Sequence, residues 1–142
     1  MKKLSNLVLI RHGQSEYNAK SLWCGWTDVK LTEKGRQEAK IAASLLTDIK
    51  FNIAFTSDLI RAKETLDIIK KELNCLDLLT IVEPAFRERH YGIYVGKNKW
   101  EIKQKLGEDE FKKLRRGWDT PIPDGESLKD VFHRVLPKFH QH

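Results

Sequence analysis

The stretch Leu7-Val8-Leu9-Ile10-Arg11-His12-Gly13-Gln14-Ser15-Glu16-Tyr17-Asn18 decides how the rest of the chain is interpreted. Its first four residues are apolar and mostly branched, which is typical of a strand buried on both faces in a parallel sheet covered by helices. The run stops at Arg11-His12-Gly13, where the carboxyl end of such a strand opens into a crevice. Ligands of open α/β sheets usually bind in this crevice, so the sequence predicts a site directly after the strand.

The side chains that follow this strand suit a phosphoryl group. A neutral imidazole at His12 can attack phosphorus and hold the phosphoryl group covalently, while Arg11 offers a planar set of donors to its oxygens. Gly13 allows close approach of the backbone, and Ser15 and Asn18 add short polar side chains. A helix that starts just after Gly13 would point free N–H groups at an anion. The alternative is structural, with His12 donating a hydrogen bond at a strand end and Arg11 paired with a carboxylate.

Length and composition indicate a single domain. The chain has 142 residues, of which 40% are hydrophobic and 32% charged, so it is long enough for one sizeable core but short for a full parallel-sheet enzyme. No run approaches the length of a transmembrane helix, and the first residues lack the apolar region of a signal peptide. We therefore expect a cytoplasmic protein without a membrane partner. Cys24 and Cys75 have neither a disulfide framework nor metal-ligand spacing.

The excess of 26 basic over 20 acidic residues gives a net charge of +6. This charge is compatible with nucleic acid, an anionic membrane or small phosphorylated substrates. Basic residues gather between Lys97 and Arg116, but no RNA-binding or helix-turn-helix signature accompanies them. We expect a small phosphorylated substrate and no nucleic acid, because Arg11 and His12 already suit a compact phosphate ligand.

Strands and helices alternate along the chain, which is the pattern of a parallel sheet. The spacing predicts a helix after an N-cap at Thr32, strands over 51–57 and 79–82, and an amphipathic helix over 128–139. Arg61 falls in the first turn of a helix between the two strands, where a cation opposes the helix dipole. A phosphate ligand would explain this position, and the alternative is an exposed surface arginine.

The string L-V-L-I-R-H-G-Q-S-E-Y-N resembles the signature of the histidine phosphatase superfamily, and of its phosphoglycerate mutase branch in particular. T-S-D-L-I-R-A at 56–62, R-E-R-H-Y-G at 87–92, G-K-N-K at 96–99 and R-R-G-W at 115–118 are similar to the later motifs of that branch.

The resemblance runs from Leu7 to Phe139 and implies one phosphoglycerate mutase-like domain over 1–142. The implied fold is α/β, a three-layer α/β/α sandwich with a mainly parallel sheet. The family pattern continues beyond this chain with a further strand that ends in a second His-Gly motif. We therefore expect the fold to be incomplete at its C-terminus.

The resemblance also implies interconversion of 2-phosphoglycerate and 3-phosphoglycerate, a step of glycolysis and gluconeogenesis. The phosphoryl primer would be 2,3-bisphosphoglycerate, and no metal would take part. His12 would carry the phosphoryl group, Glu88 would move protons, and Arg11 and Arg61 would neutralise phosphate charge. The residues implied to bind substrate are Arg11, Ser15, Asn18, Cys24, Gly25, Arg61, Glu88, Arg89, His90, Tyr91, Lys99, Arg115 and Arg116.

The segment 21–28 carries no period, and we predict a loop that returns across the crevice. Trp23 and Trp26 are expected to cover an edge of the core rather than to touch substrate. Cys24 stands where the family generally has a threonine, a change that removes a hydroxyl from the substrate contacts.

Several alternatives stay open at this point. Glu88 is flanked by Arg87 and Arg89 and would form a plain ion pair with either. A broad phosphomonoesterase of the same superfamily would use water as acceptor, although Arg115 and Arg116 favour a second phosphate. An inactive remnant would keep the motifs without turnover, and the missing second histidine predicts little mutase activity for this chain. Whether copies of the chain associate is also left open.

Overall fold

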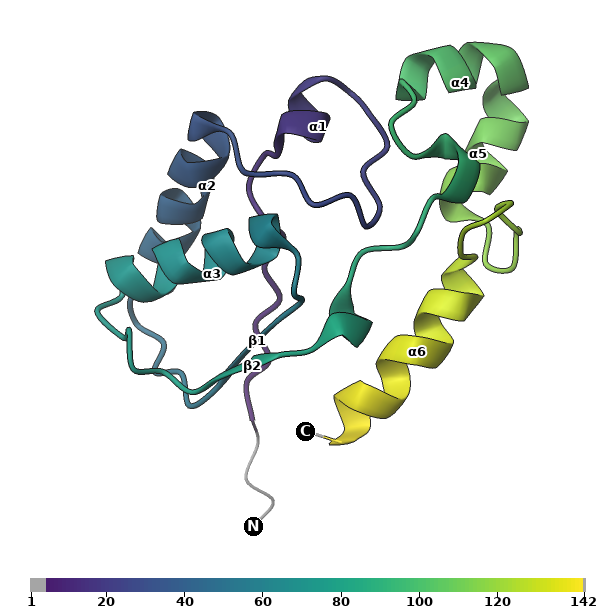
Figure 1. Cartoon of the computed structure of the whole chain (residues 1–142). Helices are drawn as coiled ribbons and strands as arrows, with labels where there is room; N and C mark the ends of the chain where they lie inside the picture. The colour runs from purple at the N-terminus through teal and green to yellow at the C-terminus, as the bar shows by residue number, and fades with distance from the viewer. Residues whose placement is uncertain (1–4, 142) are drawn as a thin grey trace.

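The structure, a computed structural model, describes residues 5–141 (Figure 1). The first four residues, on which the expectation of no signal peptide partly rests, and His142 lie outside this range. The elements are α1 Glu16–Ala19, α2 Glu33–Ser44, β1 Ala54–Thr56, α3 Ile60–Glu72, β2 Thr80–Val82, two 3-10 turns at Pro84–Phe86 and Gly92–Tyr94, α4 Lys99–Leu106, α5 Glu108–Arg116 and α6 Leu128–Gln141.

The two strands pair in parallel, with Ala54 opposite Thr80 and Thr56 opposite Val82. The helix α3 connects them, and α2 packs against α3 (Figure 1). The predicted α/β class, the parallel pairing and both strand positions are confirmed. Within residues 5–141 the sheet has only these two strands, so it is narrower than the sheet of the expected sandwich.

The strand predicted for residues 7–10 does not form. Leu7 is 63% exposed and Leu9 is 84% exposed, and no backbone hydrogen bond joins this segment to another described segment. The segment, purple in Figure 1, is extended but lies outside the two-stranded sheet. A strand is stabilised by its neighbours on both sides, and apolar residues without such neighbours stay in solvent.

The main core cluster lies around α4 and α5, apart from the two-stranded sheet (Figure 1). It joins Trp23 to Ile102 of α4, to Phe111 and Leu114 of α5, and to Ile122. The sequence analysis predicted Trp23 at an edge of the core. Trp23 is instead 2% exposed and lies within this cluster. The loop that contains it is thereby fixed against α4 and α5.

Helix starts follow local sequence. The Thr32 hydroxyl accepts a hydrogen bond from Gly35 N at 3.1 Å and begins α2, as predicted.

In α3 the buried positions are Arg61, Thr65 and Ile69, which recur every four residues along one side of the helix. Two polar side chains therefore share the buried side of α3, and this is where the site lies.

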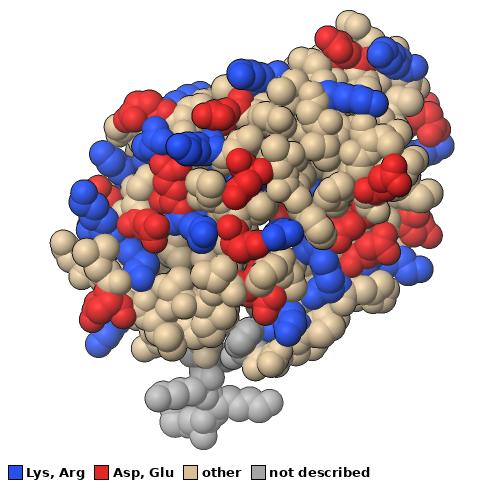
Figure 2. Space-filling model, viewed as in Figure 1, with Lys and Arg blue, Asp and Glu red and all other residues tan. Residues whose placement is uncertain are grey.

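The predicted amphipathic helix is confirmed as α6, but no residue of it is buried. Phe132 and Phe139 are 43% and 48% exposed. On the face seen in Figure 2, basic and acidic side chains are interspersed rather than gathered by sign. Among residues 5–141 we find no helix with the length and apolarity needed to cross a membrane.

Candidate active site

His12 lies between the extended segment and α1 with its tautomer set by the backbone. Its Nδ1 is 2.7 Å from the carbonyl oxygen of Gly13. A carbonyl oxygen only accepts, so Nδ1 carries the proton and Nε2 keeps its lone pair. Burial lowers the pKa of His12 below the ordinary 6.5, and the nearby charges of Arg61 and Arg11 lower it further. The ring is therefore a neutral imidazole at pH 7, the form that acts as a nucleophile.

Arg61 is 1% exposed and contacts four groups. Its Nε donates to His12 Nε2 at 3.3 Å, and its Nη1 donates to Thr27 O at 2.9 Å. Its Nη2 donates to Gly25 O at 2.7 Å and to Glu88 Oε2 at 3.0 Å. Carbonyl and carboxylate oxygens thus compensate a cation at a helix start. The alternative of an exposed surface arginine is wrong.

The carboxylate of Glu88 faces Arg61 and not the arginines beside it in sequence. Arg87 pairs with Asp58, and Arg89 donates to backbone carbonyls. The alternative in which Glu88 forms an ion pair with Arg87 or Arg89 is therefore wrong. Through Arg61, the structure brings Glu88 and His12 into contact with one guanidinium.

Gly13 is needed for a close backbone approach, as predicted, but the neighbour is a helix rather than a ligand. A Cβ atom at Gly13 would lie 2.1 Å from the carbonyl oxygen of Gly35, and a Cβ at Gly35 would lie 2.1 Å from that of Gln14. The amide N of Gly13 donates to Thr65 Oγ1 at 3.2 Å. The sequence analysis missed Thr65, although its position four residues after Arg61 was the available signal.

Ser15 and Asn18 cap the short helix α1. The Ser15 hydroxyl accepts from Asn18 N at 3.2 Å and donates to Asn18 Oδ1 at 2.9 Å, and Ser15 is 0% exposed. This is a reciprocal capping box. Ser15 and Asn18 thus have a structural role in α1, and their contact with substrate stays a prediction.

Cys24 and Gly25 form the loop that covers Arg61. The Cys24 thiol is buried and lies 3.5 Å from Thr27 O. Burial raises the pKa of this thiol, so it stays protonated at neutral pH. Gly25 has a φ of 55°, a left-handed conformation that favours glycine, and this turn directs its carbonyl to Arg61.

Tyr91 and Lys99 contact the core tryptophan beside the site. The rings of Tyr91 and Trp23 lie 4.5 Å apart, and Lys99 Nζ lies 5.5 Å from the Trp23 ring. Burial and then the charge of Glu88 raise the pKa of Tyr91 to about 12. Burial lowers the pKa of Lys99, partly offset by the charge of Glu88. Both side chains therefore share the electrostatic environment of the site.

Arg89 and His90 connect the site to the loop before α6. Arg89 is 4% exposed and donates to the carbonyls of Glu126 at 2.6 Å and Leu114 at 3.0 Å. Its Nη2 has no hydrogen-bond partner among the described residues. The backbone N of His90 donates to Glu126 Oε2 at 2.8 Å. Glu126 was missed because nothing in its local sequence marks a contact so far along the chain.

Three predicted arginines are exposed. The side chains of Arg11, Arg115 and Arg116 form no hydrogen bond or ion pair with another described residue, although Arg115 lies over the Phe111 ring at 5.7 Å. The charge of Arg11 acts on His12 and Lys99, and that of Arg115 acts on Tyr91 and Lys99. Both arginines therefore add positive potential to the site, whereas the structure does not connect Arg116 to His12.

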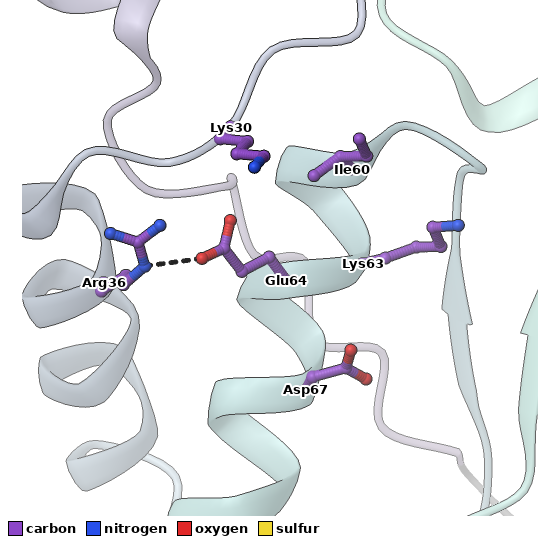
Figure 3. Close-up of a pocket in the computed structure, with 6 residues that line it drawn as sticks. All are labelled: Lys30, Arg36, Ile60, Lys63, Glu64 and Asp67. Atoms are coloured by element: carbon purple, nitrogen blue, oxygen red, sulfur yellow. Dashed lines mark hydrogen bonds and ion pairs between the residues drawn. The ribbon is translucent and has the colours of Figure 1, made fainter.

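Two surface hollows lie apart from His12. One, of about 320 Å³, is lined by Arg115, Arg116 and neighbouring residues of α4 and α5. The other, of about 380 Å³, lies beside α2 and α3, where Arg36 Nε and Glu64 Oε1 are 2.6 Å apart (Figure 3). None of the predicted site residues lines this second hollow, and the charges of Arg36 and Glu64 in it neutralise each other. Across residues 5–141 no cluster of three or more His, Cys, Asp or Glu side chains is placed to hold a metal ion.

Comparison with family models gives a match to the histidine phosphatase superfamily (branch 1) over residues 7–142. A 2,3-bisphosphoglycerate-dependent phosphoglycerate mutase from Nitrobacter winogradskyi is 49% identical over 137 residues, covering 95% of this chain and 66% of the relative. The mutase of the same name from Bartonella henselae is 49% identical over 138 residues, covering 96% and 67%. The chain thus spans about two thirds of the length of these relatives.

Solved structures show the same fold. A protein described as mycobacterial hydrolase 1 is 30% identical with a TM-score of 0.79, covering 92% of this chain and 61% of that protein. A mycobacterial glucosyl-3-phosphoglycerate phosphatase is 29% identical with a TM-score of 0.78, covering 92% and 59%.

Proposed function

This chain belongs to the histidine phosphatase superfamily, and from that premise we propose that it transfers phosphoryl groups through His12 as a phosphoglycerate mutase. The observation that carries the proposal is the state of His12. Its protonated Nδ1 is held by Gly13 O, and its unprotonated Nε2 lies beside the guanidinium of Arg61. A nucleophile and a fixed cation are thus in contact, which is what phosphoryl transfer requires.

The proposed reaction has two half-reactions. His12 Nε2 attacks the phosphorus of a phosphate ester, a P–N bond forms, and the P–O bond to the glycerate oxygen breaks. Glu88 enters the first half-reaction in its protonated form and gives that proton to the departing oxygen. The carboxylate so formed, the form that pairs with Arg61, takes a proton from the oxygen that later attacks the phosphohistidine. The Nδ1–H bond to Gly13 O stabilises the positive ring, and Arg61 and Arg11 neutralise charge on the phosphoryl oxygens.

We propose 2-phosphoglycerate and 3-phosphoglycerate as substrates and 2,3-bisphosphoglycerate as primer, which makes the protein an isomerase of the intramolecular phosphotransferase type. Two relatives at 49% identity carry the name of that mutase. Lys99 and Arg115, whose charges reach the site, would bind the carboxylate and the second phosphate of such ligands. These substrates are small metabolites, in keeping with the expectation of a cytoplasmic protein.

A broad phosphomonoesterase is the second candidate. Solved structures that match at 29–30% identity are described as a phosphatase and a hydrolase. In such an enzyme water would replace the returning glycerate at the phosphohistidine. The ratio of phosphate released to phosphoglycerate isomerised separates the two, and a ratio far above one would favour the phosphatase.

The proposal is tested by incubating the chain with 2,3-bisphosphoglycerate and following acid-labile, base-stable phosphate bound to protein. We expect label on wild type and on His133→Gln, a matched change on the exposed face of α6, and none on His12→Gln. Chelator should leave labelling unchanged, because the proposed site neutralises phosphate with arginines rather than a metal. Label that persists in His12→Gln, or that requires a divalent metal, would contradict the mechanism.

A further inference from the structure

The backbone on either side of Glu88 is held by a side chain from α6. Arg134 Nη2 donates to the carbonyl oxygens of Arg87 and Glu88, each at 3.0 Å, and Arg134 Nη1 donates to Ala85 O. The same guanidinium pairs with Glu126, with Nε at 2.6 Å from Oε1 and Nη2 at 3.0 Å from Oε2. One side chain therefore contacts three carbonyls in the segment that carries the proposed proton donor.

Trp26 also donates to the carbonyl of Glu88. Its Nε1 donates to Glu88 O at 2.7 Å. The guanidinium carbons of Arg87 and Arg134 lie 5.0 Å and 5.8 Å from the Trp26 ring, within the range of cation–π attraction. The His90 ring meets Trp26 edge-on at 4.9 Å. Segments around residues 26, 88 and 134 thus meet at one carbonyl oxygen.

Glu126 completes the arrangement as a charged group. Burial raises its pKa, but hydrogen bonds from Arg134 and from the backbone N of His90 outweigh burial and leave the pKa below its ordinary value. The carboxylate is therefore ionised at neutral pH; both its oxygens accept from Arg134, and Oε2 also accepts from the backbone N of His90. Arg134 cannot turn away from the Glu88 segment without leaving this carboxylate half-satisfied.

We propose that Arg134 is a positioning residue that fixes the Glu88 backbone so that its carboxylate stays on Arg61 beside His12. Arg134 contacts neither His12 nor the Glu88 carboxylate, so it acts only through the main chain. A guanidinium suits this task because its planar donors reach several carbonyls at once, which an ammonium group does not. The role in catalysis rests on the proposed function, but the positioning itself is a property of the folded chain.

The first measurement is the pKa of the His12 ring, followed by NMR titration of the full chain. The charge of Glu88 raises the pKa of His12, so any retreat of that carboxylate lowers it. Glu88→Gln gives the reference fall in the His12 pKa, and we expect a smaller fall in Arg134→Gln. In Arg134→Lys the pKa should lie between the values of wild type and Arg134→Gln. Lys129→Gln, an exposed neighbour on α6, is the matched control and should leave the pKa unchanged. Removal of the Arg134 charge alone would raise the pKa, so a fall reports movement of Glu88.

A double-mutant comparison separates positioning from a general loss of structure. In a Glu88→Gln background, Arg134→Gln should produce no further fall in the His12 pKa, because the group it positions has lost its charge. The Trp26 indole N–H resonance should shift in Arg134→Gln and stay in place in Lys129→Gln. If Arg134→Gln does not fold, Arg134→Lys and Trp26→Phe carry the same expectation.

The proposal is overturned if Arg134→Gln leaves the His12 pKa at the wild-type value, or lowers it equally with and without the Glu88 carboxylate. These titrations need no phosphoryl transfer, so a chain that never forms phosphohistidine refutes the proposed function and leaves this test intact. Where transfer occurs, Arg134→Gln should slow His12 phosphorylation by about tenfold to a hundredfold, since small misplacements cost rates of that order. The affinity for 2,3-bisphosphoglycerate should change little.

Discussion

Arg61 joins the two groups that the proposed reaction needs. Its Nε contacts His12 and its Nη2 contacts Glu88, while two loop carbonyls hold the remaining donors. Carbonyl and carboxylate oxygens hold this buried guanidinium beside His12, and its Nε–H must leave the Nε2 lone pair when Nε2 attacks phosphorus, which frees that donor for a phosphoryl oxygen. At the scale of single residues, the site is organised around this side chain.

Glu88→Gln should depress phosphorylation of His12 far more than binding. The amide keeps the shape of the carboxyl group but neither gives nor takes the proton, and general acid–base catalysis contributes about a hundredfold or more. Rapid-quench labelling gives the rate and calorimetry gives the affinity for 2,3-bisphosphoglycerate. Glu72→Gln, an exposed change at the C-terminal end of α3, should alter neither. An unchanged rate in Glu88→Gln would reduce Glu88 to an ion-pair partner of Arg61.

The pH dependence of labelling follows from the lowered pKa of His12. The nucleophile is the neutral ring, so its availability is lost only as pH falls through a pKa below 6.5. We expect an acid limb that begins only below about pH 6.5, whatever slope proton donation by Glu88 adds at higher pH. In Glu88→Gln the ring pKa drops further, so this acid limb should move to lower pH. A limb that starts above pH 7 would contradict the assignment.

At the scale of elements, α2 meets the segment around His12 through two glycines. Gly13 and Gly35 face each other so closely that a Cβ on either would lie about 2.1 Å from a backbone oxygen. The two glycines therefore set the distance between α2 and the nucleophile. Thr65 of α3 contributes by accepting from Gly13 N at 3.2 Å.

Gly35→Ala should lower the free energy of unfolding despite the better helix propensity of alanine. Propensity alone would stabilise α2 by about 1 kcal/mol, whereas forcing an extra methyl against backbone costs typically 1–3 kcal/mol. Because Gln14 O cannot move aside as a flexible side chain would, we expect the second effect to win. The midpoint of urea unfolding measures the change, with Lys40→Ala on the exposed side of α2 as control. A higher midpoint for Gly35→Ala would show that the crossing is looser.

For the whole molecule, the distribution of apolar side chains is uneven. One core cluster lies around Trp23, α4 and α5, whereas Leu7, Leu9 and Ile10 are 63%, 84% and 41% exposed. The backbone of this segment makes no ladder hydrogen bond with another described residue. An apolar extended segment with free N–H and C=O groups readily pairs with another chain.

We therefore expect the chain to associate in a concentration-dependent way through residues 7–10. Leu9→Lys places a charge on this segment and should shift the population toward monomer in sedimentation velocity at several concentrations. Leu76→Lys, at a position 68% exposed elsewhere, should leave association as in wild type. A wild-type chain that stays monomeric across the range would contradict this expectation.

The sequence by itself determined the features that depend on near neighbours. The helix cap at Thr32, both strands of the parallel pair and the amphipathic pattern of α6 were all predicted, because capping and periodicity are local properties. The R-H-G motif marked the position of His12 for the same reason. These are also the features that assigned the chain to the α/β class.

Tertiary structure alone decided which charged groups meet. Glu88 pairs with Arg61 and not with the adjacent arginines, and Arg134 reaches back 46 residues to hold its carbonyl, because ion pairs and carbonyl contacts form between whichever groups the folded chain brings together. The same dependence on distant partners explains why the apolar pattern of residues 7–10 predicts a strand that does not form. A strand is defined by hydrogen bonds to its neighbours, and its own side chains, however apolar, do not supply them.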